Sequence, residues 1–317
     1  MEGGKYMNIA CIGNVVYDFV VFTNKFVKEN TKASYSKINV NTGGPACNAA
    51  CILNRYGNQV DFYGQIGKDG FGEEVYSKLY SEGLNLKHLA VSEDIMTPFS
   101  FVIVNTENGS RTINSVRSPQ DLENAKINNF SYRTDYDYIL TDGKYAEDSI
   151  SLIRDNPNAI SIIDAGRWDE GILKLCENVD FIICSEEFAS NVTGIDINHN
   201  YLNDTKVYNK LKERFPDATG IAITVGKYGY FYEEDGVVLN IPCYDPGMPS
   251  IDTNCAGDIF HAAFTHALAQ GSYYSDALEF ANVVASISTT RNGGKDSCPS
   301  LDEVNYVLND LARKRIK

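Results

Sequence analysis

The stretch IDTNCAGDIFHAAF, residues 251–264, places two acids and a glycine at the start of a strongly apolar helix. A helix start has unpaired N–H groups and a partial positive charge, so it binds anions such as phosphate. Gly257 lets an anion approach the main chain closely, and Asp258 stands in the first turn. Asp258 either complements the helix dipole, worth about 0.3–1 kcal/mol, or removes a proton from a hydroxyl that attacks a phosphate. These residues by themselves leave both interpretations open.

A second stretch with chemical potential is NTGGPACN, residues 41–48. Pro45 suits the first position of a helix, and Gly43 and Gly44 allow the chain to turn closely past a ligand. Asn48 then projects from the first helical turn. Its amide either binds a hydroxyl group of a ligand or supplies ordinary polarity at a helix start.

The elements that must position these residues alternate along the chain. Apolar strands are predicted over residues 7–13, 60–67, 136–143, 159–166, 179–185 and 220–226. Helical patterns are predicted over residues 45–56, 71–82, 146–155, 204–214, 255–270 and 273–290. Such alternation predicts an α/β fold whose mostly parallel sheet is covered on both faces. Ligands bind at the carboxyl ends of such strands, where this chain repeatedly carries Gly or Asp, including Asp142 and Asp164.

Two segments interrupt this alternation with period-2 patterning typical of hairpins. They span about residues 17–42 and 98–117, and the second contains the turn sequence NTENGS with Asn108-Gly109 at its tip. A small sheet built from both segments would either cover the cleft as a lid or form a dimer face. We therefore expect one domain over residues 1–317 with a discontinuous β lid, and a homodimer through that lid.

Composition limits the partners of the protein. The 317 residues carry a formal net charge of -14, which argues against nucleic acid and anionic membranes because both require a basic surface. The apolar run near the amino end is too short for a membrane span. The eight cysteines include no CxxC pair, which predicts a reduced, cytoplasmic protein without a disulfide framework.

Several common chemistries lack their sequence signatures. The chain has no GxxxxGK[ST] motif, and the first strand is followed by a single glycine rather than GxGxxG, which argues against a dehydrogenase. The four histidines form no HExxH motif. His261 and His266 are five residues apart, so they lie on different faces of their helix and make a poor metal pair.

At this point the motifs resemble a family. The sequence DTNCAGD, residues 252–258, resembles the DTxGAGD signature of the ribokinase-like (PfkB) carbohydrate kinases, with Cys255 where glycine is usual. Other motifs similar to those of the family follow in the same order along nearly the whole chain: IGNVVYD (12–18), GGPACNAA (43–50), GQIGKDGFG (64–72), TVGKYG (224–229) and Asn282.

The resemblance implies a ribokinase-like fold with a small β-sheet lid and ATP-dependent phosphorylation of a sugar-like hydroxyl. Asp258 would then be the general base, and the N–H groups of Cys255, Ala256 and Gly257 would form the anion hole. A non-catalytic sugar or nucleoside sensor on the same fold is the alternative, but such a protein has no need for Asp258.

The resemblance also divides the remaining residues between two ligands. It implies that the sugar contacts Asp18, Gly43, Gly44 and Asn48, with Asp142 as a further hydroxyl acceptor. Arg111 and Arg167 are either candidates for a polar or anionic substituent of the substrate or solvated surface residues. On the nucleotide side the implied residues are Thr224, Gly226, Lys227, Gly229 and Asn282.

Departures from the family pattern concern the metal ions. Many members use Asn-x-x-Glu to organise Mg²⁺, but here Ser185 and Phe188 stand at those two positions. Glu186 or Glu187 either substitutes for the missing ligand or lies on a solvated helix face. We expect Mg²⁺ to arrive mainly on nucleotide oxygens and waters. Asp252 is a candidate for a monovalent cation such as K⁺. The sequence leaves ketoses, pentoses, nucleosides and aminated or sulfonated sugars open as substrates.

Overall fold

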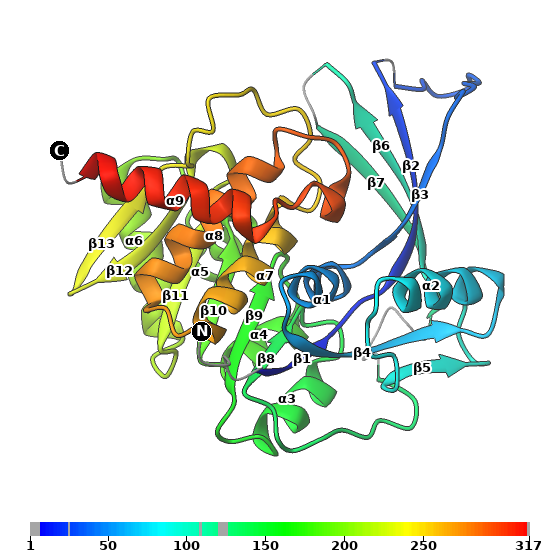
Figure 1. The fold of residues 1–317 in the computed structure, drawn as a ribbon, viewed down its shortest axis with the longest axis horizontal. Coiled ribbons are helices and arrows are strands. Elements are labelled where there is room, and N and C mark those ends of the chain that lie inside the picture. Colours follow the sequence, from blue (N-terminus) through cyan, green and yellow to red (C-terminus); the bar gives the residue numbers. More distant parts are fainter. Residues whose placement is uncertain (1–6, 25, 108–109, 120–125, 316–317) are drawn as a thin grey trace.

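The computed structural model describes residues 7–24, 26–107, 110–119 and 126–315. The predicted turn tip Asn108-Gly109 lies outside the described residues. Within them the helices and strands form two sheets of unequal size, with helices packed on the larger one (Figure 1).

The larger sheet has nine strands among the described residues and is parallel except at one edge. Its order is β13 (Val237–Ile241), β12 (Tyr230–Glu234), β11 (Gly220–Thr224), β10 (Phe181–Ser185), β9 (Ile160–Ala165), β8 (Tyr138–Thr141), β1 (Asn8–Ile12), β4 (Gln59–Gly67) and β5 (Leu89–Ser92). Only β12 and β13 pair antiparallel to their neighbours. All six strands predicted from the sequence are present, whereas β5, β12 and β13 were not predicted.

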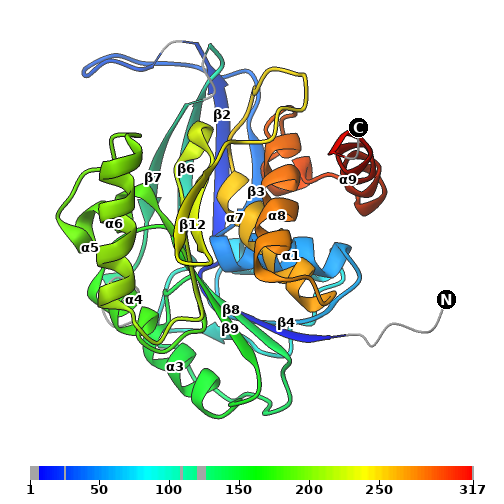
Figure 2. The ribbon, with the colours of Figure 1, turned by 90° about the vertical axis from the view of Figure 1, so that its left-hand side faces the viewer.

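Helices cover both faces of this sheet (Figure 2). One hydrophobic cluster contains α1 (Pro45–Arg55), α2 (Gly70–Ser81), α7 (Ala256–Ala269), α8 (Tyr274–Ser288) and α9 (Leu301–Arg315). On the other face lie α3 (Ala146–Arg154), α4 (Glu170–Cys176), α5 (Glu186–Thr193) and α6 (Tyr201–Arg214). All six predicted helices are present, and α4, α5 and α9 are additional.

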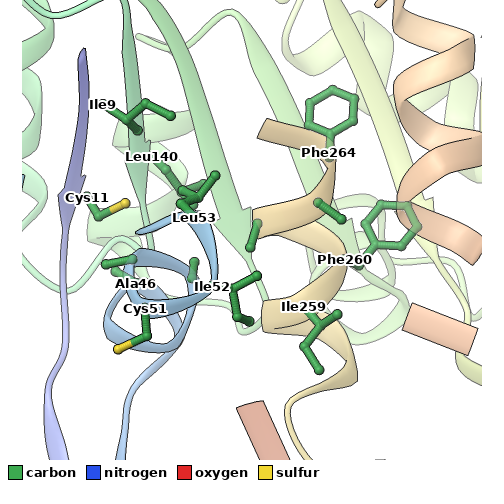
Figure 3. Close-up of a cluster of buried hydrophobic side chains, with 14 of the residues drawn as sticks. Ile9, Cys11, Ala46, Cys51, Ile52, Leu53, Leu140, Ile259, Phe260 and Phe264 are labelled. Carbon is green, nitrogen blue, oxygen red and sulfur yellow. The ribbon is translucent and has the colours of Figure 1, made fainter. Parts of the chain in front are cut away.

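The core beneath the site is the contact of α1 and α7 with the central strands (Figure 3). Every residue of α7 from Ile259 to Ala269 is buried, as expected for a helix that is apolar on all sides. The helices α1 and α7 pack directly against each other. As a result, the amino-terminal turns of α1 and α7, with Asn48 and Asp258, lie side by side.

The smaller sheet confirms the two predicted hairpins and joins them. Its order is β3 (Asn39–Gly43), β2 (Val16–Thr23), β6 (Phe99–Asn105) and β7 (Arg111–Val116). The β2–β3 and β6–β7 pairs are antiparallel, and β2 and β6 pair in parallel. Phe71 at the start of α2 stacks on Tyr17 and packs edge-on to Phe19, which anchors one face of this sheet. The sheet projects away from the larger one (Figure 1).

Candidate active site

The first turn of α7 is open towards solvent and ligands. Cys255 precedes the helix with a left-handed backbone (φ 62°), and no side chain caps the helix start. Among the described residues, the N–H groups of Cys255 and Gly257 have no hydrogen-bond acceptor, and that of Ala256 makes one 3.3 Å bond to the carbonyl of Thr253. A Cβ atom on Gly257 would meet no atom within 4 Å. This helix start therefore has the unpaired donors that the sequence predicts.

Two cavities meet at this helix start. The smaller, about 460 Å³, lies between the smaller sheet and the carboxyl ends of the strands, and the larger, about 720 Å³, lies beside η2 (Gly226–Tyr228) and α8. Arg111, Thr224 and Gly257 line both. A group at Gly257 is thus accessible from either cavity.

The structure brings most predicted residues to the expected cavity. The smaller cavity is lined by Asp18, Gly44, Asn48, Arg111, Asp142, Arg167, Cys255, Gly257 and Asp258. The larger cavity is lined by Thr224, Gly226, Lys227, Gly229, Ala256, Gly257 and Asn282. Gly43 lies beneath Asp18 rather than on the cavity wall, and a Cβ atom there would come within 1.8 Å of Asp18 Oδ2.

Asp258 is held by a neighbouring amide. The side-chain nitrogen of Asn48 donates to Asp258 Oδ2 at 2.6 Å and also lies 3.3 Å from Cys255 Sγ. Removal from water raises the pKa of Asp258 above its ordinary value, while the bond from Asn48 and the charges of His261 and Arg111 oppose that rise. The side-chain carbonyl oxygen of Asn48, Oδ1, is buried and has no hydrogen-bond partner among the described residues. Such a buried acceptor is costly unless a ligand satisfies it.

Asp18 extends from β2 into the same cavity. Its Oδ1 accepts a short hydrogen bond from the hydroxyl of Ser100, its register partner on β6. Burial raises the pKa of Asp18 to about 6, and the bond from Ser100 works against that shift, whereas the charge of Asp258 adds to it. Two carboxylates thus share one cavity, and the charge of Asp258 contributes to the raised pKa of Asp18.

Asp142 lines the cavity, but the main chain occupies much of its carboxylate. Oδ2 accepts the N–H of Asn14 at 2.8 Å and that of Ala46 at 3.2 Å, and Oδ1 accepts the N–H of Lys144 at 3.0 Å. Asp142 therefore fixes the loop after β1 and the start of α1, which is a role that the sequence did not predict. Its predicted contact with a substrate hydroxyl stays a prediction.

Three arginines face the smaller cavity. Arg111 on β7 reaches across to α7, with Nη1 at 3.4 Å from the carbonyl oxygen of Thr253, and so lies where the two cavities join. Arg167 forms a 3.0 Å ion pair with Asp169 at the cavity edge. Arg117, which the sequence analysis missed, donates to Asn14 Oδ1 at 2.9 Å.

On the nucleotide side, the loop after β11 is shaped by glycine. Gly229 has φ 99°, and a Cβ atom there would come within 1.9 Å of the carbonyl oxygen of Ile241. The amide of Asn282 donates to the carbonyl of Pro242 at 2.9 Å and accepts the N–H of Tyr244 at 3.3 Å. Asn282 thereby holds the loop that forms one wall of the larger cavity.

The two predicted metal ligands, Asp252 and Glu187, lie in different surroundings. Both carboxylate oxygens of Asp252 accept main-chain N–H groups, Oδ1 from Asn254 at 2.9 Å and Oδ2 from Gly293 at 3.2 Å. Glu187 is exposed on α5 and lines neither cavity, and Phe188 is fully buried. Within the described ranges no group of three or more His, Cys, Asp and Glu residues could hold a metal ion.

Two further expectations concern the whole chain. All eight cysteines are free thiols in the structure. Searched over its described part, the chain contains no helix with the length and apolar character needed to cross a bilayer.

Several site residues carry no recognisable signal in the sequence. Asn14, Ser100 and Arg117 come from separate loops and strands and meet only because the smaller sheet forms. Asp164 and His261 also lie in the smaller cavity, 3.3 Å apart between Oδ2 and Nδ1. The sequence placed Asp164 at a strand end and offered His261 only as a poor metal ligand, although a histidine on an apolar helix needs partners when it is buried.

Together, the two sheets, the flanking helices and the paired cavities at an uncapped helix start define an α/β enzyme of the ribokinase-like fold. Residues 7–301 match the family described as pfkB family carbohydrate kinase, and the chain belongs to that family. The protein is therefore a carbohydrate kinase, a phosphotransferase with an alcohol group as acceptor.

Individual relatives agree with this assignment. A ribokinase of Bacillus subtilis (strain 168) is 28% identical over 313 residues, which cover 95% of this chain and 99% of the relative. The structure of a putative ribokinase from Agrobacterium tumefaciens superposes with a TM-score of 0.85 at 23% identity and covers 97% of this chain and 99% of that one. A ribokinase of Arabidopsis thaliana complexed with ribose and ATP has a TM-score of 0.77 at 19% identity, covering 96% and 98%.

Proposed function

We propose that the protein transfers the γ-phosphoryl group of ATP to a hydroxyl of a sugar or sugar-like substrate. The observation that carries this proposal is that Gly257, at the uncapped start of α7, lines both cavities. ATP occupies the larger cavity and the sugar the smaller one, so that the phosphoryl group crosses at Gly257. Phosphoryl transfer needs mainly alignment and charge stabilisation, which such a junction supplies.

In the proposed reaction Asp258 is the general base. The acceptor hydroxyl gives its proton to the Asp258 carboxylate while its oxygen forms a bond to the γ-phosphorus. The bond from that phosphorus to the β–γ bridging oxygen breaks, and ADP leaves with the electron pair. A positioned base contributes about 10²–10⁴-fold to the rate. The N–H groups of Cys255, Ala256 and Gly257 hold the migrating group, each contributing roughly 3–4 kcal/mol to transition-state stabilisation.

In the smaller cavity, Asp18 and Asn48 bind the sugar. The carboxylate of Asp18 accepts hydrogen bonds from hydroxyl groups of the sugar. The unpartnered side-chain oxygen Oδ1 of Asn48 accepts one from a further hydroxyl group. Gly43 and Gly44 support this arrangement, because a side chain at Gly43 would displace Asp18 and one at Gly44 would come within 2.2 Å of the carbonyl oxygen of Asn14.

Two arginines that line the smaller cavity are available to substituents of the substrate. Arg111 belongs to the phosphoryl end, since it lies at the junction of the cavities, and Arg167 belongs to the outer edge, where it binds a polar or anionic substituent. Asp142 acts mainly by fixing the start of α1, with its remaining acceptor capacity open to a hydroxyl group.

The larger cavity, of about 720 Å³, has room for an adenine nucleotide. The loop with Thr224, Gly226 and Gly229 lines it on the side proposed for the phosphates. Lys227 lies at its edge and is available to the phosphates. Mg²⁺ is carried by nucleotide oxygens and waters in this proposal, because it keeps several waters and binds substrate phosphates in nucleotide sites. Asp252 orders the adjoining loops, and a K⁺ site there stays a proposal.

Three wider features complete the proposal. Ribose is the first acceptor to test, because the Bacillus subtilis relative is named ribokinase. A homodimer forms through the smaller sheet, on which Phe101 is about half exposed. The protein acts in the cytoplasm, in keeping with its eight free thiols.

A sugar sensor is not favoured, since the family comprises kinases and Asp258 is retained at the cavity junction.

The test is ADP release over a panel of aldoses, ketoses and nucleosides, measured for the wild type and Asp258→Asn. We expect the variant to lose at least 100-fold in kcat while calorimetry shows unchanged ATP binding. The matched control is Asp276→Asn, since Asp276 is an exposed acid at the equivalent position of the first turn of α8. Turnover of Asp258→Asn within tenfold of wild type would exclude Asp258 as the base.

A further inference from the structure

His261 lies one helical turn beyond Gly257 on α7 and is 4% exposed. Its Nδ1 lies 2.7 Å from the carbonyl oxygen of Gly257 and 3.3 Å from Oδ2 of Asp164 at the end of β9. Its Nε2 lies 3.2 Å from the carbonyl oxygen of Ile183 on β10. Each ring nitrogen therefore faces oxygen acceptors supplied by the surrounding elements.

This arrangement offers acceptors for an N–H donor on each side of the ring. A neutral imidazole has one N–H donor and one lone pair, whereas the imidazolium has two donors. In the neutral form one lone pair would point at a carbonyl oxygen inside the protein, which leaves two buried acceptors facing each other. The doubly protonated ring satisfies both sides, and the buried carboxylate of Asp164 supplies the opposite charge.

We propose that His261 is a positioning residue whose doubly protonated ring, paired with Asp164, keeps Asp258 ionised and adds positive charge beneath the first turn of α7. This inference rests on the proposed role of Asp258 as the base. It adds a buried cation to the helix start, which the main-chain N–H groups alone do not provide.

The charges around the ring support this direction. Asp164 on β9 and Asp258 on α7 are the acids near His261, and Asp142 after β8 adds negative charge near Asp164. Arg111 of the smaller sheet lies near Asp258, and β10 contributes only the carbonyl of Ile183. Burial raises the pKa of Asp164 to about 6, and His261 is the strongest influence in the opposite direction. The same histidine opposes the raised pKa of Asp258.

The kinetic test uses His261→Gln in the full chain. Without the cation, Asp258 holds its proton to higher pH, so the acid limb of the kcat/KM profile moves to higher pH by about one unit, a tenfold loss on that limb. The KM values for ATP and sugar stay within about threefold. The matched control is His266→Gln, because His266 is buried on the same helix, bonds Asn58 at 3.0 Å and has a pKa lowered to about 4 by burial. An acid limb that His261→Gln leaves in place overturns the proposal.

A spectroscopic test does not depend on activity or on the folding of His261→Gln. The chain has four histidines, so ¹⁵N NMR of the labelled wild-type protein resolves His261 by elimination, using glutamine variants of His88, His199 and His266. We expect both ring nitrogens of His261 to give imidazolium shifts at neutral pH, and Asp164→Asn to return one of them to the neutral form. A nitrogen with the shift of an unprotonated ring in the wild type overturns the proposal. It would leave the role of Asp258 intact, which the Asp258→Asn experiment decides separately.

Discussion

Two helix starts in this protein look alike in sequence and differ in structure. The segment KDGFGEE, residues 68–74, opens α2, and the segment NCAGDIF, residues 254–260, opens α7. Each combines an acid with glycine within a few residues. At α2 the acid precedes the helix, and Asp69 Oδ1 accepts the N–H of Gly72 at 2.8 Å. At α7 the acid is the third helical residue, and the position before the helix is Cys255, which makes no cap.

The difference shows what makes a helix start available to a ligand. Asp69 has an extended backbone (φ -140°), which turns its carboxylate back onto the helix, and its Oδ2 accepts the N–H of Thr97 at 2.8 Å. Burial alone would raise the pKa of Asp69, but the amides of Thr97 and Gly72 outweigh it and lower that pKa. At α7 burial prevails and the pKa of Asp258 is raised. Asp69 therefore occupies an N–H donor at the start of α2, whereas no side chain occupies the donors at the start of α7, where Asp258 stands.

The largest expected effect comes from filling the open start. In Gly257→Val the side chain enters empty space at the junction of the cavities, so the fold is retained but the phosphoryl group is displaced from the N–H donors. We expect kcat to fall about 100-fold. Gly70→Val at the start of α2, where a Cβ atom also meets nothing within 4 Å, should leave kcat within twofold. Equal kcat values for the two variants would remove the distinction between the two helix starts.

A smaller effect is expected from opening the closed start. Asp69→Ala removes the cap of α2 and should lower the free energy of unfolding by about 1 kcal/mol, measured in urea, with little change in kcat. Because folding lowers the pKa of Asp69, the ionised carboxylate stabilises the protein above its unfolded pKa, and this contribution is lost as the pH falls through the folded pKa. The stability difference between wild type and variant should therefore narrow in acid. A difference that does not change with pH would contradict the cap.

The smallest effect concerns the backbone of Cys255. A residue other than glycine in the left-handed region destabilises the folded state by about 1–2 kcal/mol. Glycine avoids this strain, but its more flexible unfolded chain offsets roughly 0.5–1 kcal/mol of the gain. Cys255→Gly should thus be more stable than Cys255→Ala by about 1 kcal/mol or less, measured by chemical unfolding. Both variants lack the thiol, so their difference isolates the backbone. An alanine variant as stable as the glycine variant would mean that φ 62° costs nothing here.

The sequence alone was sufficient for the elements and for the family. Continuous apolar strands and amphipathic helices have periods that local side-chain chemistry dictates, so their positions were predicted to within a few residues. The antiparallel pair β12–β13 was missed because strands of five residues with mixed exposure carry a weak pattern. The short helices α4 and α5 were missed, although they are capped by Asp169 and Ser185, residue types that commonly mark the start of a helix in a sequence.

What the sequence determined about the site was its chemistry: an acid and unpaired donors at one helix start, and glycines beside an asparagine at another. The tertiary structure decided which of these side chains face a ligand. Asp18 lies within β2 and Asp142 directly follows β8, yet only Asp142 is bound by three main-chain amides, because the start of α1 and the loop after β1 converge on it. His261 and Asp164 are 97 positions apart and meet only when α7 packs on β9. Hydrogen bonds and charges act over a few ångströms in space, and distance along the chain does not specify which groups come that close.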